Sequence, residues 1–170
     1  MPLTVQQKSV YHIIFNATMI ARSISKNPNY NGTQSINKFR QSTIETIEKL
    51  AESMSKGTLT DNMITDSIED LKKKTKVSFG QAQKPLNVIL KYHYYLTYPK
   101  KRVRAIEQLL HCPIDSVVLK SLKYRATSLA KIKKKEYLKI QKMIENDSPT
   151  TKIAFDSVWD NQHLNGYSVT

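Results

Sequence analysis

The sequence has few cysteines, glycines and prolines, and it has no long apolar run. Its 170 residues include one cysteine, Cys112, which excludes an intrachain disulfide and suggests a reducing compartment. Four glycines and six prolines argue against long flexible linkers. No apolar run reaches the length of a membrane span, and the N-terminal segment lacks the pattern of a secretion signal. We therefore expect a protein with no membrane partner that is cytoplasmic or nucleoid-associated rather than secreted.

The sequence also lacks the common signatures of metal, nucleotide and hydrolase sites. Its four histidines are scattered, with no pair at metal-ligand spacing and no second cysteine for zinc. No Walker-type phosphate loop, dinucleotide fingerprint or nucleophile elbow occurs. The carboxylates between residues 61 and 70 follow an amphipathic helical pattern, which is more often a solvated face than a two-metal site. We therefore expect no metal and no cofactor.

What the sequence does contain is a regional excess of positive charge. The formal net charge is +13, and residues 72–142 hold 19 lysine and arginine residues against three carboxylates. The remainder of the chain has 8 basic and 11 acidic residues. Such an excess predicts one strongly positive face, whose partner we expect to be nucleic acid, in the first place double-stranded DNA. A lysine-rich surface that serves only solubility is the alternative.

Hydrophobic periodicity predicts an all-α protein, with one compact domain over residues 1–170 and about seven or eight helices. Gly57 is a candidate C-cap, and Thr60 or Asp61 is a candidate N-cap. Residues 60–97 form a hairpin-like element with a turn at 78–80, and residues 98–145 form a basic C-terminal half. The expected helices cover about residues 5–25, 33–56, 60–71, 82–96, 103–110, 116–123 and 127–145, with a last short helix around Phe155, Val158 and Trp159.

Two segments combine residues that suit chemistry on nucleic acid. In GQAQK, which runs from Gly80 to Lys84, the lysine lies in the first turn of a predicted helix, where backbone N–H groups suit a phosphate. The helix dipole and the surrounding lysines favour the neutral amine, which is the nucleophilic form. In HCPIDSVVL, Asp115 interrupts an apolar run, and it can cap a helix or stabilise a cationic transition state. Taken singly, a phosphate contact and a helix cap are the simpler interpretations.

Together these segments resemble the helix-hairpin-helix DNA glycosylase superfamily. In that family a Gly-x-Gly-x-Lys motif supplies a lysine that attacks the sugar C1′, and a downstream Pro-Val-Asp segment supplies an aspartate. The separation of 31 residues between Lys84 and Asp115 is most similar to that of the archaeal 8-oxoguanine DNA glycosylase type. Ala82 replaces the second glycine, and the single cysteine excludes branches with an iron–sulfur cluster. The segments are also similar to small uncharacterised bacterial and phage-associated proteins.

The resemblance implies a DNA glycosylase/lyase that excises a modified, flipped-out base through a Schiff base on Lys84, with Asp115 stabilising the positive charge. Trp159 is a candidate for stacking on that base, and filling of the core is its alternative role. Two other classes also fit: a non-catalytic basic helical protein that binds DNA or RNA, and a phage or host interaction protein. The expected nucleic-acid contacts are Gly80, Gln81, Gln83, Lys91, Lys131, Lys133, Lys134 and Lys135.

Overall fold

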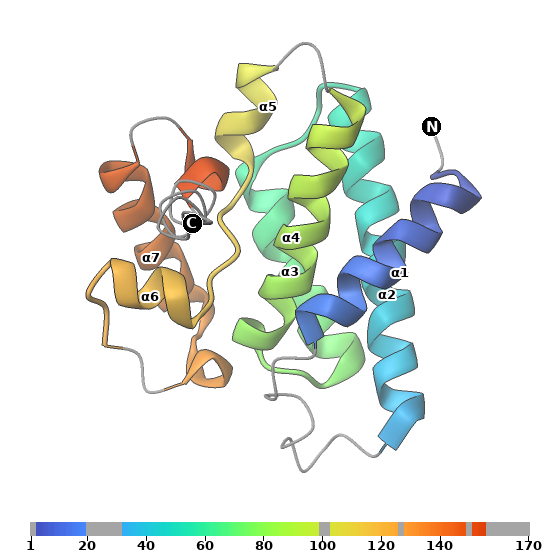
Figure 1. The fold of residues 1–170 in the computed structure, drawn as a ribbon, viewed down its shortest axis with the longest axis horizontal. Coiled ribbons are helices and arrows are strands. Elements are labelled where there is room, and N and C mark those ends of the chain that lie inside the picture. Colours follow the sequence, from blue (N-terminus) through green and yellow to red (C-terminus); the bar gives the residue numbers. More distant parts are fainter. Residues whose placement is uncertain (1–2, 20–31, 99–102, 126–127, 149–150, 156–170) are drawn as a thin grey trace, which may run out of the picture.

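The chain folds into helices arranged around one central helix, as the computed structural model shows (Figure 1). The structure describes residues 3–19, 32–98, 103–125, 128–148 and 151–155. Within these ranges all regular secondary structure is helical and no strand occurs, which confirms the all-α prediction. The helices of the described ranges are α1 (Val5–Met19), α2 (Gly32–Ser55), α3 (Asp61–Thr75), α4 (Phe79–Thr97), α5 (Arg104–Leu109), α6 (Ser116–Ser121) and α7 (Lys134–Asp147), with 3-10 turns η1 (Leu129–Lys131) and η2 (Lys152–Ala154).

Local capping signals explain where several helices begin and end. Gly57 follows α2 with a φ of +68°, a conformation that glycine adopts without strain. Thr60 is the N-cap of α3, since its hydroxyl accepts a hydrogen bond from the Met63 backbone N–H at 3.3 Å. Asp115 is the N-cap of α6. The candidate caps in the sequence are thereby confirmed, with Thr60 rather than Asp61 at the start of α3.

α4 is the central element because it contacts α1, α2, α3 and η1. In Figure 1, α1 and α2 lie to the right of α4, and α6 and α7 lie to its left. The core runs through both sides, with side chains such as Phe39, Leu86 and Ile140 fully buried. Burial of each such side chain contributes about 1.5–3 kcal/mol. A hydrogen bond of 2.6 Å between the Tyr11 hydroxyl and His93 Nδ1 joins α1 to α4.

The connection between α3 and α4 differs from the glycine turn that the sequence predicts. The two helices are joined by residues 76–78, and Lys76 has the left-handed conformation, with a φ of 58°. Ser78 is the N-cap of α4, so Gly80 lies inside the first helical turn rather than in the connection. The predicted turn at 78–80 is therefore wrong, because the Ser78 cap starts the helix three residues before the predicted start at Ala82.

The single basic helix predicted over residues 127–145 is also wrong, since this segment is divided into η1 and α7. Ile132 and Lys133 have extended backbones between the two elements, with ψ values of 120° and 165°. The physical cause is packing: the Leu129 backbone lies against Gly80, and Ile132 is 2% exposed. The chain therefore crosses the start of α4 before α7 begins. Val158 and Trp159, placed in a last helix by the sequence, lie outside the described residues.

Candidate nucleic-acid interface

The structure brings together Lys84 and Asp115, the two residues predicted to carry the chemistry. Lys84 Nζ lies 3.4 Å from Asp115 Oδ2, and their side chains are 23% and 30% exposed. The other carboxylate oxygen, Oδ1, accepts hydrogen bonds from the backbone N–H groups of Val117 and Val118, at 2.9 and 3.0 Å. Asp115 therefore combines a helix cap, worth about 1 kcal/mol, with a partly exposed ion pair that contributes less.

Gln83 holds the backbone beside this pair in a fixed position. Its side-chain amide donates a hydrogen bond to the Ile114 carbonyl at 2.6 Å and accepts one from the Ile114 N–H at 3.0 Å. Gln83 is 0% exposed, so both bonds form away from water. Because Gln83 precedes Lys84 and Ile114 precedes Asp115, this two-bond contact sets the relative position of the charged pair.

The residues around Gly80 have packing and capping roles. Ser78 and Gln81 form a capping box, in which Gln81 Oε1 accepts from the Ser78 N–H at 2.9 Å. A Cβ atom added to Gly80 would lie 1.8 Å from the Leu129 carbonyl oxygen. Gly80, Gln81 and Gln83 are all buried, so the structure does not support the nucleic-acid contacts predicted for them.

A buried chain of polar side chains, which the sequence did not reveal, links α3, α4 and α7. His111 Nε2 lies 2.7 Å from Asp61 Oδ1, and His111 Nδ1 lies 2.7 Å from the Tyr137 hydroxyl. Asn87 Nδ2 donates to that hydroxyl at 2.8 Å and to Gln83 Oε1 at 3.2 Å. The chain therefore runs from the edge of α3 to the residue that positions Lys84 and Asp115.

The protonation states of this chain follow from burial and hydrogen bonding. Burial lowers the pKa of His111, and the hydrogen bond from His111 lowers the pKa of Asp61. Burial raises the pKa of Tyr137 well above its ordinary value. A neutral His111 that donates a hydrogen bond from Nε2 to Asp61 and accepts one at Nδ1 from the Tyr137 hydroxyl satisfies all of these contacts. Tyr137 is fully buried, so the arrangement stabilises the fold and offers no substrate a nucleophile.

The predicted lysines of the C-terminal half meet at a surface pocket between α3 and the start of α7. This pocket, which we call the lysine pocket, has a volume of about 710 Å³. Lys131, Lys133 and Lys135, three of its lining lysines, are exposed. The lining residues are Glu69, Lys72, Ser78, Phe79, Ala130, Lys131, Ile132, Lys133, Lys134 and Lys135.

The lysines of this pocket differ in their pairing. Lys72 and Lys134 form ion pairs with Glu69 and Asp66, at 2.6 and 2.9 Å. Within the described part of the chain, no carboxylate lies within ion-pair distance of the other three lysines. The charge of those three is therefore available to an anionic partner.

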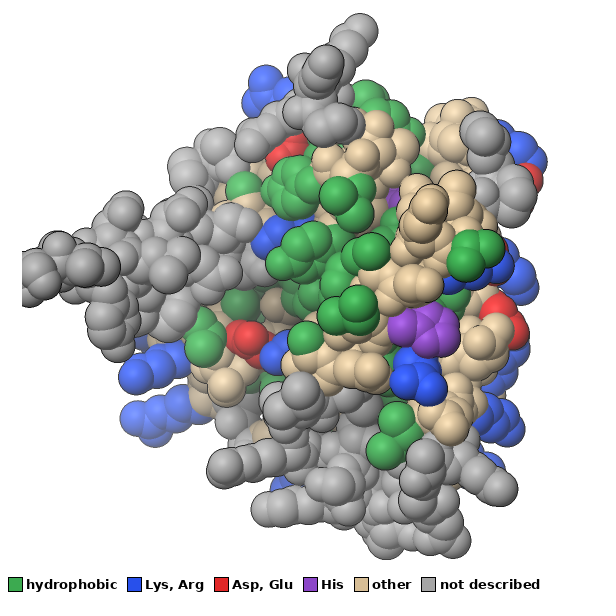
Figure 2. Space-filling model, turned by 45° about the vertical axis from the view of Figure 1, so that its right-hand side comes forward, with side chains coloured by type: hydrophobic (Ala, Val, Ile, Leu, Met, Phe, Trp, Pro, Cys, Tyr) green, Lys and Arg blue, Asp and Glu red, His purple; other side chains and the backbone are tan. Residues whose placement is uncertain are grey.

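Figure 2 shows the molecule turned so that α1 and α2 come forward. On this face, hydrophobic side chains lie in the middle and basic side chains lie mainly at the edges.

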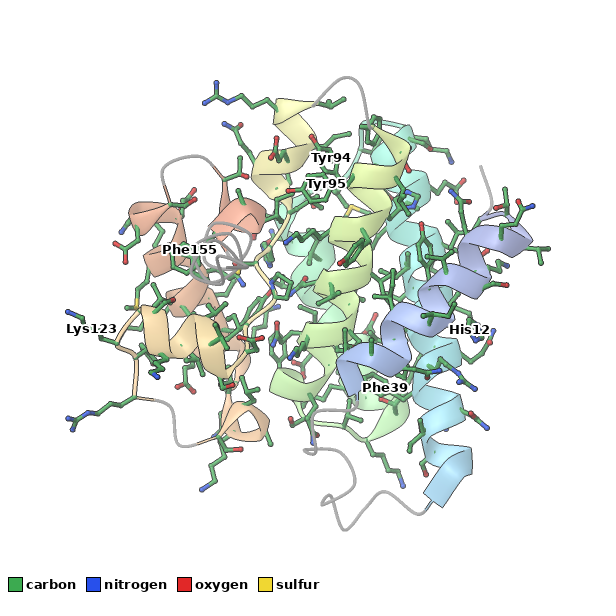
Figure 3. All side chains as sticks on the ribbon, viewed as in Figure 1. His12, Phe39, Tyr94, Tyr95, Lys123 and Phe155 are labelled. Atoms are coloured by element: carbon green, nitrogen blue, oxygen red, sulfur yellow. The ribbon has the colours of Figure 1, made fainter. Side chains whose placement is uncertain are left out.

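A second pocket adjoins the first. This tyrosine pocket has a volume of about 530 Å³ and is lined by Tyr124, Lys133, Lys135, Glu136 and Lys139. It shares Lys133 and Lys135 with the lysine pocket, so the two pockets are adjacent. Tyr124 is half-buried, and Lys139 Nζ lies 5.8 Å from the centre of its ring. Lys123, the residue before Tyr124, points outward on the side of the molecule that carries α7 (Figure 3).

The N-terminus of α7 adds to the positive potential at the boundary between the pockets. Lys133 is its N-cap residue, and no side chain in the described ranges caps the helix there. Backbone N–H groups in a first turn have no intrahelical acceptor, and the helix dipole places positive charge at that end. The lysines and the helix terminus therefore act in the same direction on an anion.

Other predicted features lie elsewhere. Lys91 is half-buried on α4, and neither Lys91 nor the pair of Lys84 and Asp115 lines either pocket. Trp159 lies outside the described residues. In the ranges that the structure describes, no histidine, cysteine or carboxylate cluster is arranged to hold a metal ion. No helix in those ranges combines the length and hydrophobicity needed to cross a membrane.

Comparison with known proteins found no match to a family model, to a curated protein or to a solved structure.

Proposed function

We propose that this chain binds nucleic acid through the adjacent lysine and tyrosine pockets. The observation that carries the proposal is the convergence of Lys131, Lys133 and Lys135, none with a carboxylate partner in the described structure, at one pocket beside the start of α7. Lysines kept only for solubility would be spread apart, because like charges repel each other. Lysines that gather without neutralising carboxylates favour a ligand with several negative charges, and a phosphodiester backbone is the common one.

The proposal predicts a binding energy dominated by release of counterions. Each phosphate contact contributes about 0.7–0.9 to the slope of log affinity against log salt. Loss of three lysine contacts therefore reduces that slope by about 2–3 and weakens binding strongly at low salt.

The test is fluorescence anisotropy with labelled DNA and RNA over a range of salt concentrations. The variant Lys131→Gln, Lys133→Gln, Lys135→Gln is compared with a matched control, Lys38→Gln, Lys49→Gln, Lys56→Gln. The control removes the same charge from exposed positions on α2 and just after it, and α2 lies on the opposite side of α4 from α7 (Figure 1). We expect the pocket variant to lose affinity and slope and the control to lose little. Equal losses would show general attraction by net charge and would contradict a defined site.

A second candidate function is the glycosylase or lyase chemistry implied by the resemblance. The observation that favours it is the 3.4 Å contact between Lys84 and Asp115, which Gln83 holds in place and which remains partly exposed. In this mechanism the Lys84 ammonium leaves the ion pair and loses a proton, which the departing base takes up. The free amine forms a bond to C1′ of a nucleotide as the bond from C1′ to the base breaks, and opening of the C1′–O4′ bond of the sugar then gives the Schiff base. The Asp115 carboxylate then faces the positive charge that develops at the sugar.

Borohydride trapping tests this chemistry directly. Duplex DNA with oxidised guanine, an abasic site or a modified cytosine is incubated with wild type, Lys84→Gln and the control Lys91→Gln. A covalent adduct that Lys84→Gln alone abolishes supports the lyase. No adduct on any substrate, with nucleic-acid binding intact, removes the lyase and leaves the binding function.

A further inference from the structure

The two adjacent pockets combine cationic and apolar lining residues. In the lysine pocket, Phe79 and Ile132, which are only 3% and 2% exposed, line the same space as the unpaired lysines. In the tyrosine pocket, Tyr124 lines the space beside Lys133 and Lys135. A ligand that contacts both the cationic and the apolar lining residues carries phosphates and also has flat, weakly polar surfaces. A nucleotide with an accessible base has both features.

Double-stranded nucleic acid does not use this lining well. In a duplex the base faces are stacked on one another, and only phosphates and groove edges are exposed. A duplex would therefore contact the lysines and leave the pocket interiors filled with water. An unpaired strand exposes its base faces and can place them against side chains while its backbone follows the cationic rim.

Tyr124 packs partly against the hydrophobic core and is held in place in the lining of the tyrosine pocket. Its hydroxyl donates to Glu136 Oε1 at 3.2 Å, and its backbone N–H donates to the Leu119 carbonyl at 2.9 Å. A ring that is already held costs little entropy to order when a base stacks on it. Lys139 is exposed and lies over the ring, so its side chain has to turn away to pair with a phosphate when a base stacks on that face.

We propose that the ligand of these pockets is a single-stranded polynucleotide, in place of the duplex expected from the sequence, with one base stacked on Tyr124 and its backbone crossing Lys133 and Lys135. The inference rests on the proposed function, because it assigns the form of nucleic acid to the same pockets. The chemistry is shared by single-stranded DNA and RNA, so the pocket accepts either strand unless the 2′-hydroxyl is also read.

The test measures anisotropy with labelled strands of about 12 nucleotides, as single-stranded DNA, single-stranded RNA and the duplex of the same sequence. Wild type is compared with Tyr124→Leu, Tyr124→Phe and the control Tyr92→Leu, which alters an exposed tyrosine of α4 outside both pockets. We expect single strands to bind more tightly than the duplex. Tyr124→Leu should weaken their binding about 5- to 100-fold, the range for loss of one stacked base, with little effect on the duplex. Tyr124→Phe keeps the ring and most of the affinity.

A second measurement does not depend on the folding of a variant. Unlabelled nucleoside monophosphates should compete with a labelled strand on wild type more strongly than inorganic phosphate at equal ionic strength. Tighter binding of the duplex, or equal competition by phosphate and nucleotides, would overturn the single-strand assignment while the lysine-dependent binding stands. Absence of lysine-dependent binding to every nucleic acid would overturn the proposed function itself. A preference between the DNA and RNA strands would identify which single strand the pockets select.

Discussion

Gly80→Ala is the substitution for which packing and helix propensity give opposite predictions. Gly80 lies in the first turn of α4, and alanine in a helix is about 0.5–1 kcal/mol more stable than glycine. Propensity alone therefore predicts a more stable protein. In the structure, however, the new Cβ would lie 1.8 Å from the Leu129 carbonyl oxygen, 2.9 Å from its carbon and 3.3 Å from Ile132 Cβ.

The magnitude follows from these distances. Non-bonded heavy atoms rest at about 3.5–4.0 Å, so the Leu129 backbone has to retreat by about 2 Å. The clash is with backbone, which cannot rotate away as a side chain can, and overpacking of this kind costs about 1–3 kcal/mol. If the gain in propensity is subtracted from the middle of that range, about 2 kcal/mol, the expected net loss is about 1–1.5 kcal/mol. Because η1 carries Lys131, the displacement should also weaken binding of nucleic acid.

Urea denaturation followed by circular dichroism measures the first effect, and anisotropy measures the second. Gly57→Ala is the comparison, since a Cβ added there would meet nothing within 4 Å and only the φ of +68° opposes the change. A Gly80→Ala protein that is as stable as wild type, with unchanged binding, would refute both the tight contact and its role in positioning η1.

Three further predictions concern the buried polar contacts and the charged pair. Gln83→Leu should lower the free energy of unfolding by about 2–4 kcal/mol, since it leaves the Ile114 N–H and carbonyl unpaired; an unchanged urea midpoint would contradict this. Asp115→Ala should lower the free energy of unfolding by about 1 kcal/mol because the helix cap is lost, whereas Asp115→Asn keeps a capping oxygen. A double-mutant cycle of Asp115→Asn with Lys84→Met measures the ion pair, and its coupling energy should be below about 1 kcal/mol. The free energy of unfolding should fall from pH 7 to pH 5, because burial lowers the pKa of His93 and His111 below 6.5 and the unfolded chain therefore takes up protons first. Below about pH 4 it should fall further, because the pKa of Asp61 is lowered in the folded protein. Urea titrations that give the same free energy of unfolding at every pH in this range would exclude both effects.

The parts of the fold that follow local rules could be predicted from the sequence. Hydrophobic periodicity located the helices, and the caps at Thr60 and Asp115 depend on residues within three positions of the helix start. The break between η1 and α7 could not be predicted in this way. No glycine or proline lies between Leu129 and Lys134, and the apolar spacing continues through the break. The extended residues there result from packing against Gly80, which is 49 residues earlier in the chain than Leu129.

In the candidate sites, too, the features that depend on composition could be predicted from the sequence, and those that depend on contacts between distant residues could not. The charge excess and the lysines at 131–135 were visible in the sequence, because charge is a property of composition. The buried chain from Asp61 to Gln83 could not be predicted, since its members come from four parts of the chain: α3, α4, α7 and the segment that precedes α6. The only local signal was a histidine within the apolar run LLHCPI. Burial alone does not tell which distant carboxylate or hydroxyl such a histidine will meet.

The buried chain from Asp61 to Gln83 also bears on how the molecule opens. His111 joins residues 50 positions before it and 26 after it, and Asn87 reaches Tyr137 over 50 positions. Apolar contacts allow a helix to slide or rotate, but directional bonds in the interior are satisfied in one register only. α7 therefore cannot detach while α4 stays intact without exposing unpaired groups of both. α7 and α4 should therefore open as one cooperative unit, and the amide hydrogens of α7 should exchange with solvent as slowly as those of α4. We expect this even though the neighbouring elements η1 and α6 are short.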